Sequence, residues 1–127
     1  MSAPFPDRAQ VDSEHVPDLL LLYLAVAYGA DRRFDKDEER SVCALLTSWL
    51  PEASGSFIAG MVRTALDLYR SGQVLDVEDL ALGLRSVLPP ALRLQVLLDL
   101  SRIAHADGER SPAEAAVIDR VRTLWSS

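Results

Sequence analysis

One stretch of the sequence occurs twice, and this repeat limits the folds that are open to the chain. Residues 21–49 and residues 97–125 align without a gap at an offset of 76 positions. Each copy has an apolar run, an Ala-Asp pair, a short polar break, a glutamate and a second amphipathic run that ends in tryptophan. The residues shared at equivalent positions include Asp31 and Asp107, Glu38 and Glu114, and Trp49 and Trp125. The pattern predicts a helix–loop–helix unit that is used twice, with an acidic loop in each copy.

Apolar residues recur at helical spacing along the whole chain, and proline, glycine and capping residues separate the runs. They predict six helices, over residues 17–29, 35–50, 56–70, 76–88, 90–106 and 111–125. Residues typical of strands are scarce. We therefore expect an all-α fold, a compact bundle of about six helices. In it the hairpins 17–50 and 90–125 are related by a pseudo-two-fold repeat, and the third and fourth helices are inserted between them.

The length of 127 residues fits one domain with a single core, and 49% of the residues are hydrophobic. Residues 1–12, which include Pro4 and Pro6, are predicted to form a flexible N-terminal arm. Residues 13–127 are predicted to form a single helical domain.

Charge and composition exclude several classes of function. The net charge of −6 argues against nucleic-acid binding, which needs a basic surface. A single cysteine, Cys43, excludes an intramolecular disulfide and a cysteine-based zinc site. The longest apolar stretch, residues 19–30, has about 12 residues where a membrane span needs about 20, and no secretory signal precedes it. The chain has no Ser/His/Asp set, phosphate-binding loop, HExxH or CxxC motif. We expect a cytoplasmic protein without a transmembrane segment that is not an enzyme.

The acidic loops have an architectural interpretation that needs no ligand. The pairs Asp35 and Glu38, and Ser111 and Glu114, have the spacing of a capping box, and a proline follows Ser111 at the first helical position. Asp31 and Asp107 can accept hydrogen bonds from loop N–H groups. On spacing alone, helix capping is favoured.

A functional interpretation is that the same oxygens hold a divalent cation. The first loop offers Asp31, Asp35 and Glu38; the second offers Asp107, Ser111 and Glu114. Such hard oxygen ligands suit Ca²⁺ or Mg²⁺. The spacing excludes an EF-hand, because the glycine and glutamate required at its sixth and twelfth positions are missing. Capping and metal binding are compatible, so both stay open.

The repeat also carries a family resemblance. The segments LAVAYGADRRFDKDEERSVCALL and IAHADGERSPAEAAVIDRV resemble the tellurite-resistance TerB family, a domain type also found in DnaJ-like membrane co-chaperones. The likeness covers residues 17–125 and implies a TerB-like helical domain. It implies a divalent-metal site at four acidic positions, Asp31, Glu38, Asp107 and Glu114. The first loop departs from the pattern, because Arg32 stands where the second loop has Gly108.

The resemblance implies a role in stress response to toxic oxyanions, within a metal-sensing assembly at the membrane. The partners would be proteins of that resistance or stress complex, and any peripheral membrane association would come through them. Two hypotheses result. The domain is a metal-binding accessory protein of tellurite-type resistance, or it is a metal-free helical scaffold for protein–protein interaction.

Overall fold

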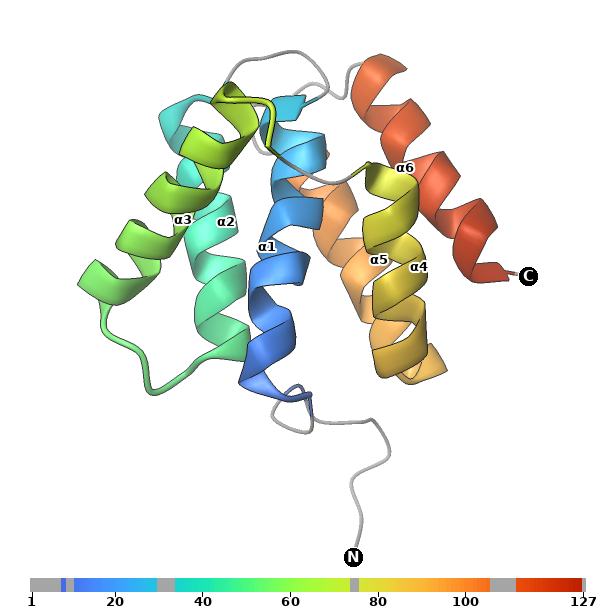
Figure 1. Ribbon diagram of the computed structural model, residues 1–127, viewed down its shortest axis with the longest axis horizontal. Coiled ribbons are helices and arrows are strands. Elements are labelled where there is room, and N and C mark those ends of the chain that lie inside the picture. Colours follow the sequence, from blue (N-terminus) through green and yellow to red (C-terminus); the bar gives the residue numbers. More distant parts are fainter. Residues whose placement is uncertain (1–7, 9–10, 30–33, 74–75, 106–111, 127) are drawn as a thin grey trace, which may run out of the picture.

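Six helices make up the computed structural model of the chain, which describes residues 8, 11–29, 34–73, 76–105 and 112–126 (Figure 1). They are α1 (Val16–Leu24), α2 (Lys36–Trp49), α3 (Gly55–Arg70), α4 (Val77–Val87), α5 (Pro90–Ala104) and α6 (Pro112–Ser126). A short 3-10 turn, η2 (Ser13–His15), precedes α1. The described ranges contain no strand, and the predicted all-α bundle is confirmed.

The helices begin where local chemistry satisfies their first N–H groups. Asp35 caps α2, and Asp76 caps α4 through a bond of 3.4 Å from the N–H of Glu78. Ser54 caps α3 by accepting a hydrogen bond from the N–H of Phe57. This helix begins at Gly55, one residue earlier than the sequence predicted. Proline stands in the first turn of α1 and α5, where a missing N–H costs nothing.

The first helix differs from its prediction in one respect. Instead of continuing as a regular α-helix to residue 29, the chain widens into a five-residue π-helical turn, η3 (Ala25–Gly29). At the start of this turn the N–H of Ala25 still reaches the carbonyl of Leu21, so η3 continues directly from α1. Turns of this kind often stand at functional sites, and this one directly precedes the first acidic loop.

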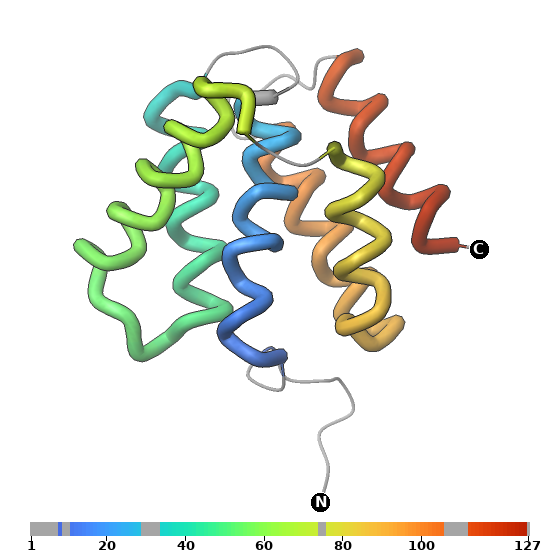
Figure 2. Tube along the Cα trace, in the orientation of Figure 1, coloured from blue at the N-terminus to red at the C-terminus, as the bar shows by residue number. Residues whose placement is uncertain are grey.

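The nearly all-apolar α1 is the central helix of the bundle. It contacts α2, α3, α4 and α5, and it lies between the α2–α3 side and the α4–α6 side (Figure 2). Leu19, Leu22 and Leu24 are fully buried, as expected for a helix that is hydrophobic all round. No helix in the described ranges is long and apolar enough to cross a membrane.

The two tryptophans that end the repeat units are both buried, with exposed fractions of 4% for Trp49 and 6% for Trp125. Both donate the indole N–H inside the core at 2.7 Å, Trp49 to the hydroxyl of Tyr23 and Trp125 to the carbonyl of Ala81. They seal the core near the ends of α2 and α6. The hydrogen-bond acceptors of the two tryptophans differ, so the tryptophans do not establish the symmetry. The pseudo-two-fold relation between the hairpins stays a prediction.

Candidate functional site

Two of the four predicted metal ligands are buried glutamates at equivalent positions. Glu38 lies in the first turn of α2 with an exposed fraction of 3%, and Glu114 lies in the first turn of α6 with 2%. The first turns of α2 and α6 lie at the same end of the bundle (Figure 1). The other two ligands, Asp31 and Asp107, lie outside the described residues.

The capping box predicted for α2 is confirmed. Oδ1 of Asp35 accepts a hydrogen bond of 2.8 Å from the N–H of Glu38, and Oε1 of Glu38 accepts one of 3.3 Å from the N–H of Asp35. Glu38 thus has at least an architectural role. The corresponding cap predicted for the second loop, Ser111, lies outside the described residues.

Glu38 and Glu114 are unusual because their ionisable side chains are almost completely buried. A buried carboxylate is costly unless hydrogen bonds or a positive charge compensate it, and the N-terminal end of a helix offers both N–H groups and a favourable dipole. In α2 the same turn also carries the exposed carboxylates of Asp37 and Glu39, which raise the local negative potential. The arrangement is suited to stabilising the helix end and to attracting a hard cation.

A second group of possible ligands lies before α1 and was missed by sequence reasoning. Asp12, Glu14 and His15 each offer one ligand atom, and these atoms all lie within 4.8 Å of one another. His15 Nε2 is 3.5 Å from Oε1 of Glu14. The two carboxylates are exposed and the histidine is half-buried. The three residues lie within four positions of the sequence, and this closeness could have indicated a shared site. A mixed oxygen–nitrogen set suits Zn²⁺ better than Ca²⁺.

A buried polar network links the chain near its N-terminus to three helices. Asp99, which is 1% exposed, receives two bonds from the guanidinium of Arg8, at 2.8 and 3.1 Å. The hydroxyl of Tyr23 donates to Oδ2 of Asp99 at 2.8 Å and accepts the indole N–H of Trp49. The guanidinium of Arg8 also stacks 4.6 Å from the centre of the Trp49 ring.

The hydrogen bonds of the network connect α1, α2 and α5. Burial, together with the neighbouring Asp99 carboxylate, raises the pKa of Tyr23, so its phenol stays protonated and serves as a donor. Every buried side-chain polar atom in the described part of the chain has a hydrogen-bond partner. A group fully engaged in this way holds helices together.

The remaining candidates for chemistry have ordinary roles. His105 ends α5 with Nδ1 2.8 Å from the carbonyl of Ser101, as expected for a histidine at a helix C-terminus. The thiol of Cys43 is half-buried, and burial, reinforced by Glu39, raises its pKa. A raised thiol pKa lowers the fraction of thiolate, which is the reactive form of cysteine.

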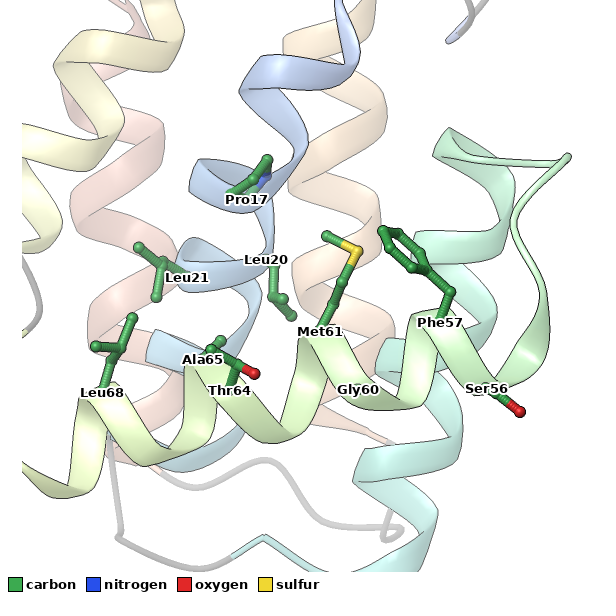
Figure 3. A pocket seen from close by; sticks show the side chains of 10 residues that line it. All are labelled: Pro17, Leu20, Leu21, Ser56, Phe57, Gly60, Met61, Thr64, Ala65 and Leu68. Atoms are coloured by element: carbon green, nitrogen blue, oxygen red, sulfur yellow. The ribbon is translucent and has the colours of Figure 1, made fainter.

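An apolar groove of about 560 Å³ runs between α1 and α3, and we call it the α1–α3 groove. Phe57, Met61 and Leu68 extend from α3 toward the side chains of Pro17, Leu20 and Leu21 on α1 (Figure 3). An adjoining cavity of about 610 Å³ shares Pro17, Phe57 and Met61 with it and continues to the α2–α3 loop. The α1–α3 groove is apolar, and the adjoining cavity adds the polar side chains of Asp12, Ser13 and Glu52 beside it.

The chain matches the family model described as tellurite resistance protein TerB over residues 19–125. Comparisons with curated proteins and with solved structures gave no significant match. The matched range includes both copies of the repeat and all six helices apart from the first residues of α1 and the last residue of α6. The chain therefore belongs to the tellurite resistance TerB family.

Proposed function

We propose that this TerB-family domain is not an enzyme and binds a divalent cation, Ca²⁺ or Mg²⁺, as part of a tellurite-resistance or stress-response assembly in the cytoplasm. The ligands would be Asp31 and Glu38 in the first loop and Asp107 and Glu114 in the second. The observation that carries the proposal is the near-complete burial of Glu38 and Glu114 at equivalent helix starts. Surface caps do not require burial of this kind.

Capping and coordination can be shared by one glutamate. Oε1 of Glu38 is engaged by the N–H of Asp35, but a carboxylate has about four lone-pair sites on its two oxygens. We expect the second loop to bind the cation more strongly than the first. Gly108 permits a tight turn beside Asp107, whereas Arg32 brings a competing positive charge beside Asp31.

The absence of a nucleophile–base set in the sequence supports a binding role rather than catalysis. The acidic net charge of −6 supports protein partners over nucleic acid. We propose partners within a resistance or stress complex.

Calorimetric titration of chelator-treated protein with Ca²⁺, Mg²⁺, Mn²⁺ and Zn²⁺ tests the metal site and locates it. An all-oxygen site should favour Ca²⁺ or Mg²⁺, while a site at Asp12, Glu14 and His15 should favour Zn²⁺. We expect Asp107→Asn to remove the Ca²⁺ or Mg²⁺ heat and Asp12→Asn to leave it unchanged. The opposite pattern would move the site to the segment before α1.

A second candidate function, a helical scaffold for protein contacts, is supported by the α1–α3 groove. Monomeric proteins rarely leave a continuous apolar surface open without a use for it. The two functions are compatible, because the groove and the first turns of α2 and α6 share no residue.

A further inference from the structure

We propose that the chain associates with further copies of itself, by seating an apolar ridge on α5 of one copy in the α1–α3 groove of the next. This inference rests on the second candidate function, in which the apolar surface contacts a protein. It identifies that protein as a second copy of the chain. It does not depend on metal binding.

The groove has the properties of a helix-binding surface. Phe57 at one end of it is 58% exposed, although it is a large aromatic side chain. Gly60, in the middle of α3, has nothing within 4 Å of the position that a Cβ would occupy. A glycine inside a helix costs about 0.5–1 kcal/mol relative to alanine, and here no neighbouring group in the described chain requires it. Its open flank permits close approach by another helix.

The ridge consists of Leu94 and Leu98 on α5, which are 62% and 58% exposed. Residues four apart lie on the same face of a helix, so these two side chains project side by side. Together with the half-buried Leu97 they present the spacing of anchors that helices use when they bind in apolar grooves. Single exposed leucines are common on protein surfaces, whereas Leu94 and Leu98 together form a small apolar patch on one helix face.

The charges beside the two surfaces are opposite. The α1–α3 groove itself is lined by no charged residue, and its adjoining cavity is lined by the carboxylates of Asp12 and Glu52 and by no lysine or arginine. The cavity beside the ridge, which includes Leu94 and Trp125, is lined by Arg93 and Arg122; Arg122 is ion-paired with Asp119 at 2.7 Å. The carboxylates beside the groove and the guanidinium of Arg93 beside the ridge have opposite charges, which favours the pairing of groove with ridge over groove with groove or ridge with ridge.

The two surfaces are also placed so that one copy can use both. The groove is formed by α1, α3 and the adjoining loops, whereas the ridge and its cavity belong to α5 and α6, and no residue is shared. In Figure 1, α3 lies in front of α2, while α5 lies behind α1 and α4. A contact between different surfaces is heterologous, and it either closes a ring or continues as a chain of copies.

The first measurement is the mass in solution as a function of concentration, by light scattering and analytical ultracentrifugation. The mean mass should rise above the 13.9 kDa of the monomer as concentration increases. Phe57→Glu, in the groove, and Leu98→Glu, on the ridge, should each remain monomeric. The matched control is Leu82→Glu, which changes another exposed leucine (44% exposed, on α4) and should associate like the wild type.

The decisive measurement mixes the two defective variants. Phe57→Glu retains an intact ridge and Leu98→Glu an intact groove, so an equimolar mixture should form a one-to-one dimer and no larger species. Circular dichroism melts of each variant would establish that it is folded. A wild-type chain that stays monomeric up to about 1 mM would overturn the proposal. So would association that survives in either single variant, because that requires a different interface. Neither result would bear on metal binding or on a foreign protein partner.

Discussion

The hydroxyl of Tyr23 donates a hydrogen bond of 2.8 Å to Oδ2 of Asp99, and these two residues stand at equivalent positions of the two repeat copies, 76 residues apart. A contact between equivalent positions is expected beside a two-fold axis, because residues next to the axis meet their own counterparts. Two carboxylates buried at this place would repel each other. A phenol opposite a carboxylate forms a donor–acceptor pair, which gives a physical reason for the copies to differ here.

Removal of the Tyr23 hydroxyl should destabilise the fold. Tyr23→Phe leaves the buried indole N–H of Trp49 without its acceptor and takes one donor from Asp99, so we expect a loss of about 1–3 kcal/mol in the free energy of unfolding. Tyr69→Phe is the matched control, since its half-buried hydroxyl donates only to the carbonyl of Leu21. Urea denaturation should show a smaller loss for the control. Equal losses of unfolding free energy in the two variants would show that the hydrogen bonds of Tyr23 to Asp99 and Trp49 add no more stability than the single bond of Tyr69.

Arg8 should contribute to stability through its contact with Asp99, which is 91 positions away in sequence. Arg8→Ala leaves the carboxylate of Asp99 buried without its cation, and hydrogen bonds to charged groups contribute about 1.5–3 kcal/mol. Arg8→Lys should recover only part of the loss, because lysine cannot form the two-pronged contact. Denaturation of both variants beside the wild type measures this. An unchanged midpoint for Arg8→Ala would show that the contact is dispensable.

The helix caps should differ in strength in a predictable order. Asp35 takes part in a reciprocal capping box, so Asp35→Ala should cost about 0.5–2 kcal/mol. Asp76 makes a single, longer bond of 3.4 Å, and Asp76→Ala should cost less. For Ser111→Ala the sequence predicts a cost in the range of the Asp35 variant. Thermal melts in the absence of divalent cations measure all three losses, and a larger loss for Asp76→Ala than for Asp35→Ala would contradict the expected order.

The buried Tyr23 and the half-buried Tyr69 should make the fold sensitive to alkali. Burial raises the pKa of Tyr23 and of Tyr69 above the ordinary value of 10.0. Above pH 10 the unfolded chain therefore loses protons that the folded chain keeps, and stability falls as the pH rises toward the folded-state pKa values. We expect melting temperatures to drop above pH 10 and to drop less steeply for Tyr23→Phe. A flat profile between pH 9 and pH 11 would contradict this.

The helices could be predicted because their signals are local. Asp35 and Pro51 set the ends of α2 within a residue or so, and the apolar periodicity between them placed Trp49 in the core. The same holds for α5, which begins at Pro90 as predicted and ends two residues earlier than expected. Burial of Glu38 at a helix start had no such signal, because a capping glutamate is commonly exposed.

The polar network could not be predicted because its members meet only through tertiary packing. Arg8 belongs to the stretch predicted as a flexible arm, yet its side chain lies against Asp99 and Trp49, which are far away in sequence. Nothing within a few residues of Asp99 marks it as buried; it reads as one polar residue among leucines of α5. The extent of the arm, residues 1–12, remains a prediction.

The central claim, that the acidic loops of this TerB domain hold a divalent cation, is tested most directly by the melting temperature with and without millimolar Ca²⁺ or Mg²⁺. A cation that binds only the folded chain adds about 2.7 kcal/mol of stability at a hundredfold excess over Kd. We predict a higher melting temperature for the wild type, and loss of most of that rise in Asp107→Asn, with little change in the metal-free variant. A wild-type melting temperature that neither cation moves would contradict the claim and leave the loops as helix caps alone.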